Sequence, residues 1–364
     1  MTAIEAADAI ALGIKKSAPG AKMLKLPLSD GGEGLVDALV RAAGGTVQKT
    51  RVTGPLGSPV EAEWGVIDKR AKAVIEMSAA SGLNLVPAEN RNPSLTSTYG
   101  TGELIKAALD EGCREIIIGI GGSATNDGGA GMARALGISF YDSNKNPLQE
   151  GGLELSKLDS IDFTGLDARL KDAKIIIASD VDNPLTGPNG ASFFYGPQKG
   201  ASPEMAEKLD RALKNYAAVI KRETGKDIDN LPGAGAAGGL GAGLIAFLGA
   251  ELKQGIELVL DALNFDQHLE DCFLLVTGEG KLDEQSLHGK APIGAARRAL
   301  KKKVPVIALA GSISGSLERF HDHGITACFA IADGPLSLEE SQARGFELLS
   351  TKAAELMRLI NTFI

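Results

Sequence analysis

The sequence contains few cysteine, histidine and aromatic residues. Its 364 residues include three cysteines, four histidines and one tryptophan, and aromatic residues make up 4% of the chain. Cys113, Cys272 and Cys328 lie far apart and form no C-x-x-C pair. They indicate small core residues in a reducing compartment, and neither a disulfide framework nor a zinc site. The sequence also suggests no Ser–His–Asp or Cys–His arrangement, which argues against a hydrolytic triad.

The chain also lacks a basic patch and a clear membrane span. Its net charge is −8, and the only basic clusters, at 297–298 and 301–303, end a predicted helix, where cations suit the helix dipole. The uncharged stretch 233–250 is rich in Gly and Ala at its start, so we expect a glycine loop followed by a buried helix. No signal peptide is evident. We therefore expect a cytoplasmic protein with no nucleic-acid or membrane partner.

The order of apolar runs predicts an α/β fold. Strands are expected at 22–28, 116–118, 174–178, 273–276, 304–310 and 327–331, and helices at 35–43, 102–111, 203–224 and 337–359. Near-continuous apolar strands alternating with helices favour a doubly wound parallel sheet. Residues 46–78 instead predict an antiparallel meander. We expect one α/β domain from 1–45, 91–137 and 231–364, and a smaller inserted mixed domain from 46–90 and 138–230.

A glycine-rich loop follows the predicted strand at 116–118. The stretch EIIIGIGGSATNDGGAG, residues 115–131, runs from a strand through a loop into a helix. Backbone N–H groups at a helix N-terminus form an anion site, usually for phosphate. The loop matches neither a Walker A motif nor the dinucleotide fingerprint, and a plain tight turn stays open. Similar loops at 30–34, 277–280 and 311–312 would share the carboxyl edge of a parallel sheet, where ligands bind.

Three charged features could carry chemistry. Asp180 follows a strand, as a reactive carboxylate or as an Asx-turn acid. Lys199 lies in the rigid segment YGPQKG, where it would hold a phosphate or stay solvated. Residues 279–290 carry two lysines and three carboxylates, which suit either an anion and cation site or a solvated loop. Phosphate loops, lysines, carboxylates and two domains are what phosphoryl transfer requires. The residues alone therefore indicate an ATP-using kinase or another enzyme of phosphorylated ligands.

Ten motifs then identify a resemblance. They run in order along the chain as SDGGEG (29–34), VTGPLG (52–57), IEMSAASGL (75–83), TSTYGTGELI (96–105), IGIGGSATNDGGAGM (118–132), SDVDNPLTGPNGAS (179–192), YGPQKGAS (195–202), PGAGAAGGLGAG (232–243), TGEGKLDEQSLHGKAPIG (277–294) and ALAGS (308–312). With these motifs the sequence resembles the glycerate kinase type 1 family over nearly all of its length. The resemblance implies a flavodoxin-like domain with a smaller domain similar to the restriction-enzyme fold. It also implies ATP-dependent phosphorylation of D-glycerate, usually at the 2-hydroxyl group, to give 2-phosphoglycerate.

On this resemblance we assign candidate site residues. Catalytic candidates are Asp180, Lys281 and Lys199, with Asp180 activating the acceptor hydroxyl. ATP phosphates would lie on one of two glycine loops, at Gly121, Gly122, Ser123, Thr125, Asn126, Gly128 and Gly129 or at Gly235, Gly238 and Gly239. The substrate would contact Asp30, Glu33, Gln285, Ser286 and Lys290. Mg²⁺ would be held by Asp127 and Asp283. A kinase for another small hydroxy acid, a non-catalytic phospho-metabolite sensor, and the choice between monomer and homodimer stay open.

One departure from the family pattern lies at the start of the sequence. The resemblance implies a short strand and an anion-binding lysine loop before the first helix, and this sequence begins at that helix. A missing strand would expose a parallel sheet edge. We therefore expect the chain as written to be poorly active or unstable, and an N-terminal extension to restore activity.

Overall fold

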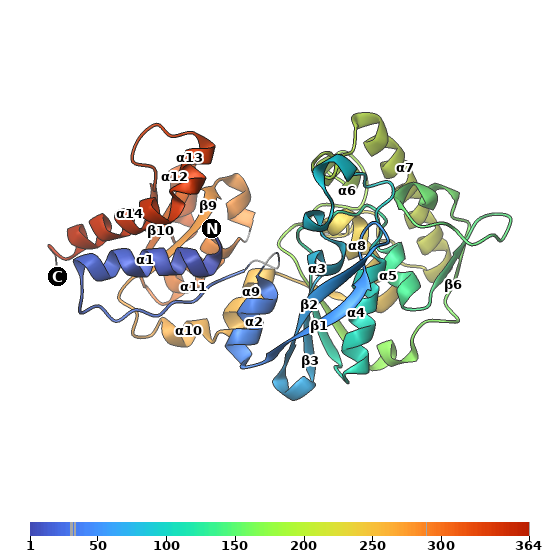
Figure 1. Cartoon of the computed structure of the whole chain (residues 1–364), viewed down its shortest axis with the longest axis horizontal. Coiled ribbons are helices and arrows are strands. Elements are labelled where there is room, and N and C mark those ends of the chain that lie inside the picture. The colour runs from blue at the N-terminus through green and yellow to red at the C-terminus, as the bar shows by residue number, and fades with distance from the viewer. Residues whose placement is uncertain (30–31, 33, 289, 364) are drawn as a thin grey trace. The chain divides into compact units, whose positions relative to one another are not determined.

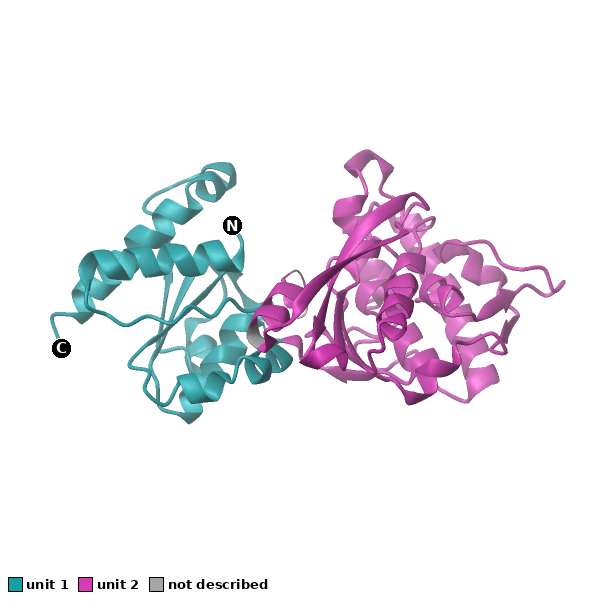
Figure 2. Ribbon diagram, turned by 60° about the horizontal axis from the view of Figure 1, so that its bottom comes forward, with its two compact units in different colours: residues 1–30, 256–364 teal, residues 31–255 magenta. Residues whose placement is uncertain are grey.

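A computed structural model describes residues 1–29, 32, 34–288 and 290–363. The chain divides into two compact units, which Figure 2 colours separately. Unit 1 combines Met1–Asp30 with Ile256–Ile364, and unit 2 is Gly31–Gly255. Each unit has its own sheet and its own hydrophobic core.

Unit 2 is built on a six-stranded sheet with the order β1-β2-β3-β4-β7-β8. Its strands are β1 (Thr46–Thr53), β2 (Pro59–Ile67), β3 (Lys72–Glu76), β4 (Glu115–Gly119), β7 (Lys174–Ala178) and β8 (Glu251–Lys253). The first three strands pair antiparallel and form the predicted meander. From β3 to β8 all pairs are parallel. Three runs of Ile and Val therefore lie side by side in the middle of the sheet, buried on both faces.

Helices cover both faces of this sheet. Because side chains alternate along a strand, Trp64 and Gly65 point to opposite faces. Gly65 has no side chain, so Val36 and Val40 of α2 (Leu35–Ala43) pack closely against its backbone on that face. Trp64 joins the core beneath α4 (Tyr99–Asp110), on the other side of the strands from α2 (Figure 1). The antiparallel strands are thus held between two helices.

A second apolar cluster in unit 2 lies away from the sheet. Phe140, Tyr216 and Phe247 form tilted or edge-to-face ring contacts at its centre. The elements around it are α5 (Ala130–Ala135), β5 (Ser139–Tyr141), β6 (Ser160–Asp162), α6 (Ala191–Tyr195), α7 (Pro203–Thr224) and α8 (Ala236–Leu248). Short helical turns connect these elements, namely η1 (Asp68–Arg70), α3 (Ser78–Ser81), η2 (Leu83–Leu85), η3 (Ala88–Asn90), η4 (Gly152–Lys157), η5 (Ala168–Asp172) and η6 (Pro197–Lys199).

Unit 1 is built on the parallel sheet β11-β10-β9. Alternate residues of β10 (Val306–Ile313) serve two cores, with Ala308 in one and Ile307 and Leu309 in the other. The Ile307 side packs with α1 (Ala3–Ser17) and α14 (Gly345–Ile360). The remaining elements are α9 (Gly255–Ala262), α10 (Phe265–His268), β9 (Leu275–Leu282), η7 (Glu284–His288), α11 (Ala291–Lys301), α12 (Leu317–Asp322), β11 (Ala327–Ala330) and α13 (Leu338–Ala343).

The structure confirms the α/β class and most predicted elements, and three features differ. The predicted loops at 277–280 and 311–312 lie within the strands β9 and β10, which run further than their apolar residues indicated. Residues 22–28 are not assigned as a strand, because none of the described residues pairs with them. The compact units also divide the chain differently from the predicted domains. The meander shares one sheet with β4 and β7, because β3 pairs directly with β4. Residues 46–90 are therefore not separated from 91–137.

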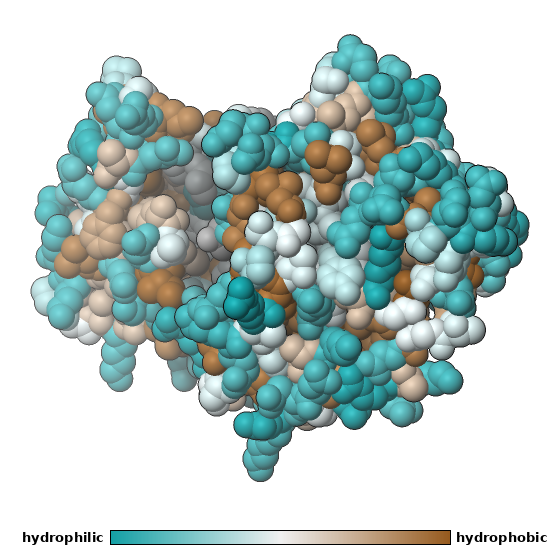
Figure 3. All heavy atoms as spheres, turned by 45° about the vertical axis from the view of Figure 1, so that its right-hand side comes forward, coloured by the Kyte–Doolittle hydropathy of each residue, from teal (hydrophilic) through white to brown (hydrophobic). Residues whose placement is uncertain are grey.

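The surface carries scattered apolar residues. On the face drawn in Figure 3, hydrophobic side chains are interspersed with hydrophilic ones. Among the described residues, no helix has the length and apolar character needed to cross a lipid bilayer. The apolar stretch 233–250 instead forms the buried α8, preceded and opened by residues in left-handed conformations. This agrees with the predicted glycine loop followed by a buried helix.

Candidate functional site

The predicted site residues fall into two groups, one in each unit. Unit 2 holds the two glycine loops with Asp127, Asp180 and Lys199, and unit 1 holds Lys281, Asp283, Gln285, Ser286 and Lys290. Asp30 and Glu33 lie outside the described residues.

In unit 2 the loops that follow β3, β4 and β7 leave the same edge of the sheet. The register pairs Glu76 with Gly119 and Gly119 with Ala178 at the carboxyl ends of these strands. Glu76 accepts a hydrogen bond from the Val36 N–H in the first turn of α2, at 2.8 Å. Asp180 follows two residues after β7, and both of its carboxylate oxygens are buried. This edge is where ligands of parallel sheets bind.

Asp127 fills the anion position that the sequence predicted for phosphate. Its Oδ1 accepts from the N–H of Gly129 at 3.1 Å, and its Oδ2 accepts from the N–H of Gly131 at 3.2 Å. Oδ2 also accepts from the N–H and the hydroxyl of Thr98, both at 2.8 Å. The N-terminus of α5 is thus capped by the chain's own carboxylate.

This capping bears on the predicted metal role of Asp127. The residue is 1% exposed, and burial raises its pKa although its four hydrogen bonds favour the ionised form. A carboxylate with both oxygens engaged inside the protein is not placed to ligate Mg²⁺. Its contacts are those of a residue that fixes the loop.

The glycines of both loops are explained by close packing. A Cβ on Gly238 would overlap the carbonyl oxygen of Thr125, and one on Gly239 would lie 2.8 Å from Cα of Gly128. The Gly128 N–H donates to the carbonyl of Gly238 at 3.0 Å. A Cβ on Gly128 itself would lie 2.5 Å from the ring of Tyr216. The two predicted phosphate loops therefore pack against each other through their backbones.

Only the first part of the β4 loop is open to solvent. Gly122 is exposed and Gly121 is partly exposed, whereas residues 123–131 and 233–239 are buried. Gly122 adopts φ +71° and its carbonyl accepts from the N–H of Leu83 at 2.8 Å. Of the residues predicted to contact phosphate over 121–129, only Gly121 and Gly122 therefore have open surface. The predicted phosphate contacts of Gly235, Gly238 and Gly239 have no open surface.

Lys199 is buried against the same loop. Its Nζ lies 2.7 Å from Oγ of Ser123 and 2.7 Å from the carbonyl oxygen of Thr125. The side chain is 1% exposed, and this burial lowers the pKa of Lys199 to about 7, against the opposing charge of Asp127. The lysine thus donates to protein groups, which differs from the predicted direct contact with a phosphate.

The network combines one predicted residue with several that were not predicted. Asn126, a predicted phosphate contact, donates from Nδ2 to Oγ of Ser192 at 3.0 Å, and its Oδ1 is buried without a hydrogen-bond partner among the described residues. The Tyr195 hydroxyl donates to Asn183 at 2.6 Å. Thr98, which binds Asp127, had one signal in the sequence, the motif TSTYG. Nothing in the sequence indicated that this threonine reaches a carboxylate 29 residues later.

In unit 1 the carboxyl end of β9 carries exposed charges. Nζ of Lys281 lies 3.1 Å from Oδ2 of Asp283, and this lysine side chain is 61% exposed. Asp283 opens η7, because its Oδ1 accepts from the Gln285 N–H and its own N–H donates to the Ser286 hydroxyl, each at 3.0 Å. The hydrogen bond from Lys281 holds the pKa of Asp283 below its usual value. Ser286 is buried, so it serves the turn, whereas the Gln285 side chain is exposed.

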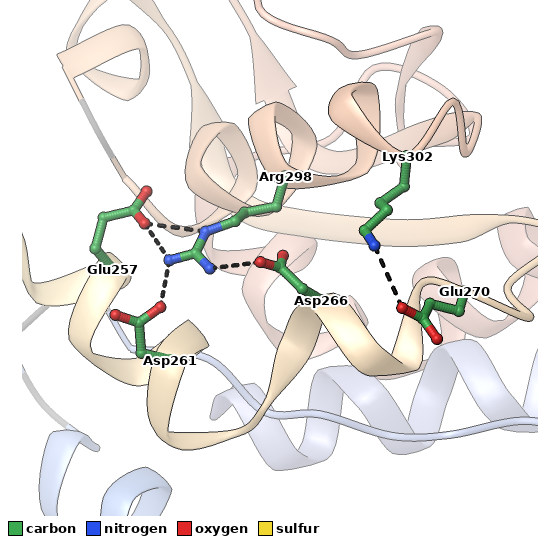
Figure 4. A network of polar contacts seen from close by, with 6 residues as sticks. All are labelled: Glu257, Asp261, Asp266, Glu270, Arg298 and Lys302. Atoms are coloured by element: carbon green, nitrogen blue, oxygen red, sulfur yellow. Dashed lines mark hydrogen bonds and ion pairs between the residues drawn. The ribbon is translucent and has the colours of Figure 1, made fainter.

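Lys290 lies at the N-cap of α11, where Nζ is 3.8 Å from Oε2 of Glu279. The position of this helix is fixed at its other end by Arg298 (Figure 4). The Arg298 guanidinium contacts Glu257 and pairs with Asp261 at 2.6 Å and with Asp266 at 3.0 Å. The cluster thereby ties α9 and α10 to α11. This edge of unit 1 presents two partly exposed lysines on a fixed scaffold.

The described residues contain no group of three His, Cys, Asp or Glu side chains that could hold a metal ion. Proteins commonly bind Mg²⁺ through one or two carboxylates together with substrate phosphates. Of the two predicted ligands, Asp283 fits that mode and Asp127 does not. Asp283 is partly exposed and only one of its oxygens accepts from a backbone N–H.

A cavity of about 630 Å³ lies elsewhere in unit 1. Its walls come from α1, residues 21–28 and residues 274–278, and it is mainly apolar. It contains none of the predicted catalytic, substrate-binding or metal-binding residues. The candidate site residues therefore lie at the carboxyl ends of the strands and outside this cavity.

Comparison with known proteins extends this description. Residues 1–361 match the profile of the glycerate kinase family. The chain is 52% identical over 341 residues to glycerate 2-kinase of Escherichia coli K12, covering 94% of this chain and 90% of that protein. It is 49% identical over 356 residues to glycerate kinase of Bacillus subtilis 168, covering 98% and 93%. A crystal structure of a provisionally assigned glycerate kinase 2 from Salmonella typhimurium LT2 superposes with a TM-score of 0.84 at 48% identity, covering 100% and 95%.

Proposed function

This chain belongs to the glycerate kinase family, and on that premise we propose that it phosphorylates D-glycerate with ATP to give 2-phosphoglycerate and ADP. The observation that carries the proposal is the 52% identity, over 94% of the chain, to a protein named glycerate 2-kinase. In the reaction, the 2-hydroxyl oxygen forms a bond to the γ-phosphorus and the bond to ADP breaks. The hydroxyl proton passes to a base.

Asp180 is our candidate for that base. It lies just beyond the carboxyl end of β7, at the sheet edge that also carries Gly121 and Gly122. Replacing Asp180 with Asn keeps the shape and removes the basic oxygen, so we expect turnover to fall by about 10²–10⁴-fold. Asp182→Asn, in the same turn and exposed, is the matched control and should stay within about twofold. Near-normal turnover of Asp180→Asn would exclude it as the base.

Lys281 and Lys290 are our candidates for binding the glycerate carboxylate. Both are at least partly exposed, so a substrate anion can reach them. Each now pairs with a carboxylate of the protein, and exposed pairs of this kind are weak enough to be exchanged. Asp283 would hold Mg²⁺ as a single carboxylate, and the ion would neutralise charge on the phosphates. Gly121 and Gly122 offer the open backbone for a phosphate.

The test is ADP release with D-glycerate, ATP and Mg²⁺, with enolase added to report 2-phosphoglycerate. We expect turnover with an enolase signal. ADP release without that signal would place the phosphate on the 3-hydroxyl group and contradict the proposed product. Faster turnover with another small hydroxy acid in a substrate panel would contradict the proposed substrate. Ligand binding without ADP release would contradict the kinase activity.

A further inference from the structure

The backbone that carries Lys199 forms a rigid turn. It ends the short turn η6, and Gly200 follows with φ +93°. A Cβ on Gly200 would overlap the carbonyl oxygen of Arg91, so the backbone passes Arg91 too closely for any other residue. The Gly200 N–H donates to Pro197 and the Ala201 N–H donates to Gly196, each at 3.0 Å. The lysine therefore projects from a fixed point toward the β4 loop.

Lys199 contacts Ser123 and Thr125, which come just after the open part of that loop, Gly121 and Gly122. Ser123 comes immediately after Gly122, and Thr125 is two residues further. The Ala124 N–H between them donates to the carbonyl of Ser81 at 3.0 Å. Gly122 is held from the same side by Leu83. Because Ser123 is joined to Gly122 through the backbone, displacement of Ser123 would also move Gly122 and strain its hydrogen bond with Leu83.

We propose that Lys199 is a positioning residue, which braces Ser123 and Thr125 and so sets Gly121 and Gly122 for the phosphates of ATP. The inference rests on the proposed function for its ligand and on the contacts of Lys199 for its mechanism. Lys199 itself would touch the protein groups Ser123 and Thr125 and no substrate. A neutral amine has two N–H donors, and the two acceptors at 2.7 Å use both of them.

Opening of the β4 loop around Lys199 should depend on pH. The charged or titratable groups around the lysine are Asp127 of the loop, Tyr195 of α6, whose ring centroid lies 6.0 Å from Nζ, and Arg91 beside Gly200. With the pKa of Lys199 lowered to about 7, the closed loop favours the neutral amine, whereas an opened loop returns the lysine to water. Opening then takes up a proton, so it becomes less favourable as pH rises. We expect the opening constant to be about tenfold smaller at pH 8 than at pH 6.

The test is amide hydrogen exchange of residues 121–125 in the full chain without substrates, at pH 6 and pH 8, corrected for intrinsic rates. Lys199→Met removes both donors and should raise the opening constant at least about tenfold at pH 8 and abolish its pH dependence. Lys199→Gln restores a non-titrating donor and should give intermediate, pH-independent protection. Lys208→Met, an exposed lysine on α7, should match the unmodified chain. Unchanged protection in Lys199→Met, or a pH dependence that persists there, would overturn the proposal.

Kinetics separate this role from a general loss of structure. We expect Lys199→Met to raise KM for ATP about tenfold with little change in KM for D-glycerate, and Lys199→Gln to recover part of the loss. Equal rises in both KM values would contradict a role confined to the β4 loop. If the chain shows no ATP-dependent turnover at all, the proposed function is wrong. The hydrogen-exchange result then still tests whether Lys199 positions Ser123 and Thr125. If Lys199→Met does not fold, Lys199→Gln and Ser123→Ala carry the same comparison.

Discussion

The β4 loop (residues 120–129) and the segment 279–290, which ends and follows β9 and is called the β9 loop, have different structural roles. Each lies at the carboxyl end of a parallel strand, and each sequence combines glycine with a carboxylate. In the β4 loop, Asp127 is 1% exposed and its oxygens accept four hydrogen bonds from the protein. In the β9 loop, Asp283 is partly exposed beside the exposed Lys281. Beyond Gly122 the first loop is a closed structural element, whereas the second is open to anions.

The difference shows that a glycine-rich loop before a helix is not by itself a phosphate site. The N–H groups at the start of α5 point at an anion, as expected, but the anion is a side chain of the same loop. The glycines are needed there because two stretches of backbone touch. What distinguishes the two loops is therefore the number of oxygens and N–H groups that remain available to a ligand.

The largest difference in the free energy of unfolding should come from replacing one glycine in each unit. In Gly238→Ala the new methyl group overlaps Thr125 O at a position with φ +68°, so we expect a loss of about 4 kcal/mol in the free energy of unfolding. Gly280→Ala meets no atom within 4 Å and should change this free energy by less than about 0.5 kcal/mol. Urea denaturation measures both. Similar losses in the two variants would remove the contrast between the loops.

The two aspartates should separate stability from activity. Asp127→Asn places an amide against N–H and O–H donors in a buried site, so we expect a loss of about 3 kcal/mol in the free energy of unfolding. Asp283→Asn should cost under about 1 kcal/mol, because its ion pair is partly exposed, and should instead lower kcat per folded molecule at limiting Mg²⁺. The measurements are urea denaturation and a magnesium titration of the rate. A stability loss confined to Asp283→Asn would reverse the assignment.

The buried lysine of the closed loop makes stability depend on pH. The folded state releases the proton of Lys199 near pH 7, whereas the unfolded state keeps it up to about pH 10.5. The unfolded state binds more protons between these values, so the free energy of unfolding should rise by about 2 kcal/mol from pH 7 to pH 9 relative to Lys199→Met. Urea denaturation at three pH values provides the comparison. Parallel profiles for the two proteins would show that Lys199 does not carry this dependence.

The smallest expected effect concerns the open loop. Lys281→Met removes an exposed charge near the proposed glycerate carboxylate, so we expect KM for D-glycerate to rise about tenfold, equivalent to about 1.4 kcal/mol. Lys301→Met, at the exposed end of α11, is the matched control. The measurement is initial rates at saturating ATP. An unchanged KM in Lys281→Met would remove this lysine from substrate binding.

The sequence predicted the elements better than the site, for identifiable physical reasons. The apolar runs at 116–118 and 174–178 and the alternation at 60–66 report local burial, and all three became strands. Residues 22–28 have the same apolar character, but a strand also needs a neighbour to pair with, which local sequence does not specify. For the same reason the sequence did not place the meander beside β4.

The predicted roles of Asp127 and Lys199 depended on partners distant in sequence. Thr98 lies 29 residues from Asp127, and Ser123 lies 76 residues from Lys199. The local sequence shows that Asp127 lies in a glycine loop and Lys199 in a rigid turn. It does not show whether distant residues already use the hydrogen-bonding capacity of these two side chains. The printed contacts of Asp283 in the β9 loop, by contrast, lie within three positions of it, so they depend on local sequence alone.

The most direct test of the contrast is a titration of the ¹⁵N-labelled full chain with D-glycerate, followed by amide chemical shifts. We expect shift changes in residues 279–290 and none in residues 123–131, and we expect Lys281→Met to lower the affinity for D-glycerate about tenfold. Shift changes confined to 123–131, with unaltered affinity in Lys281→Met, would contradict it. They would mean that the β4 loop opens to bind the substrate and that the lysines of the β9 loop do not.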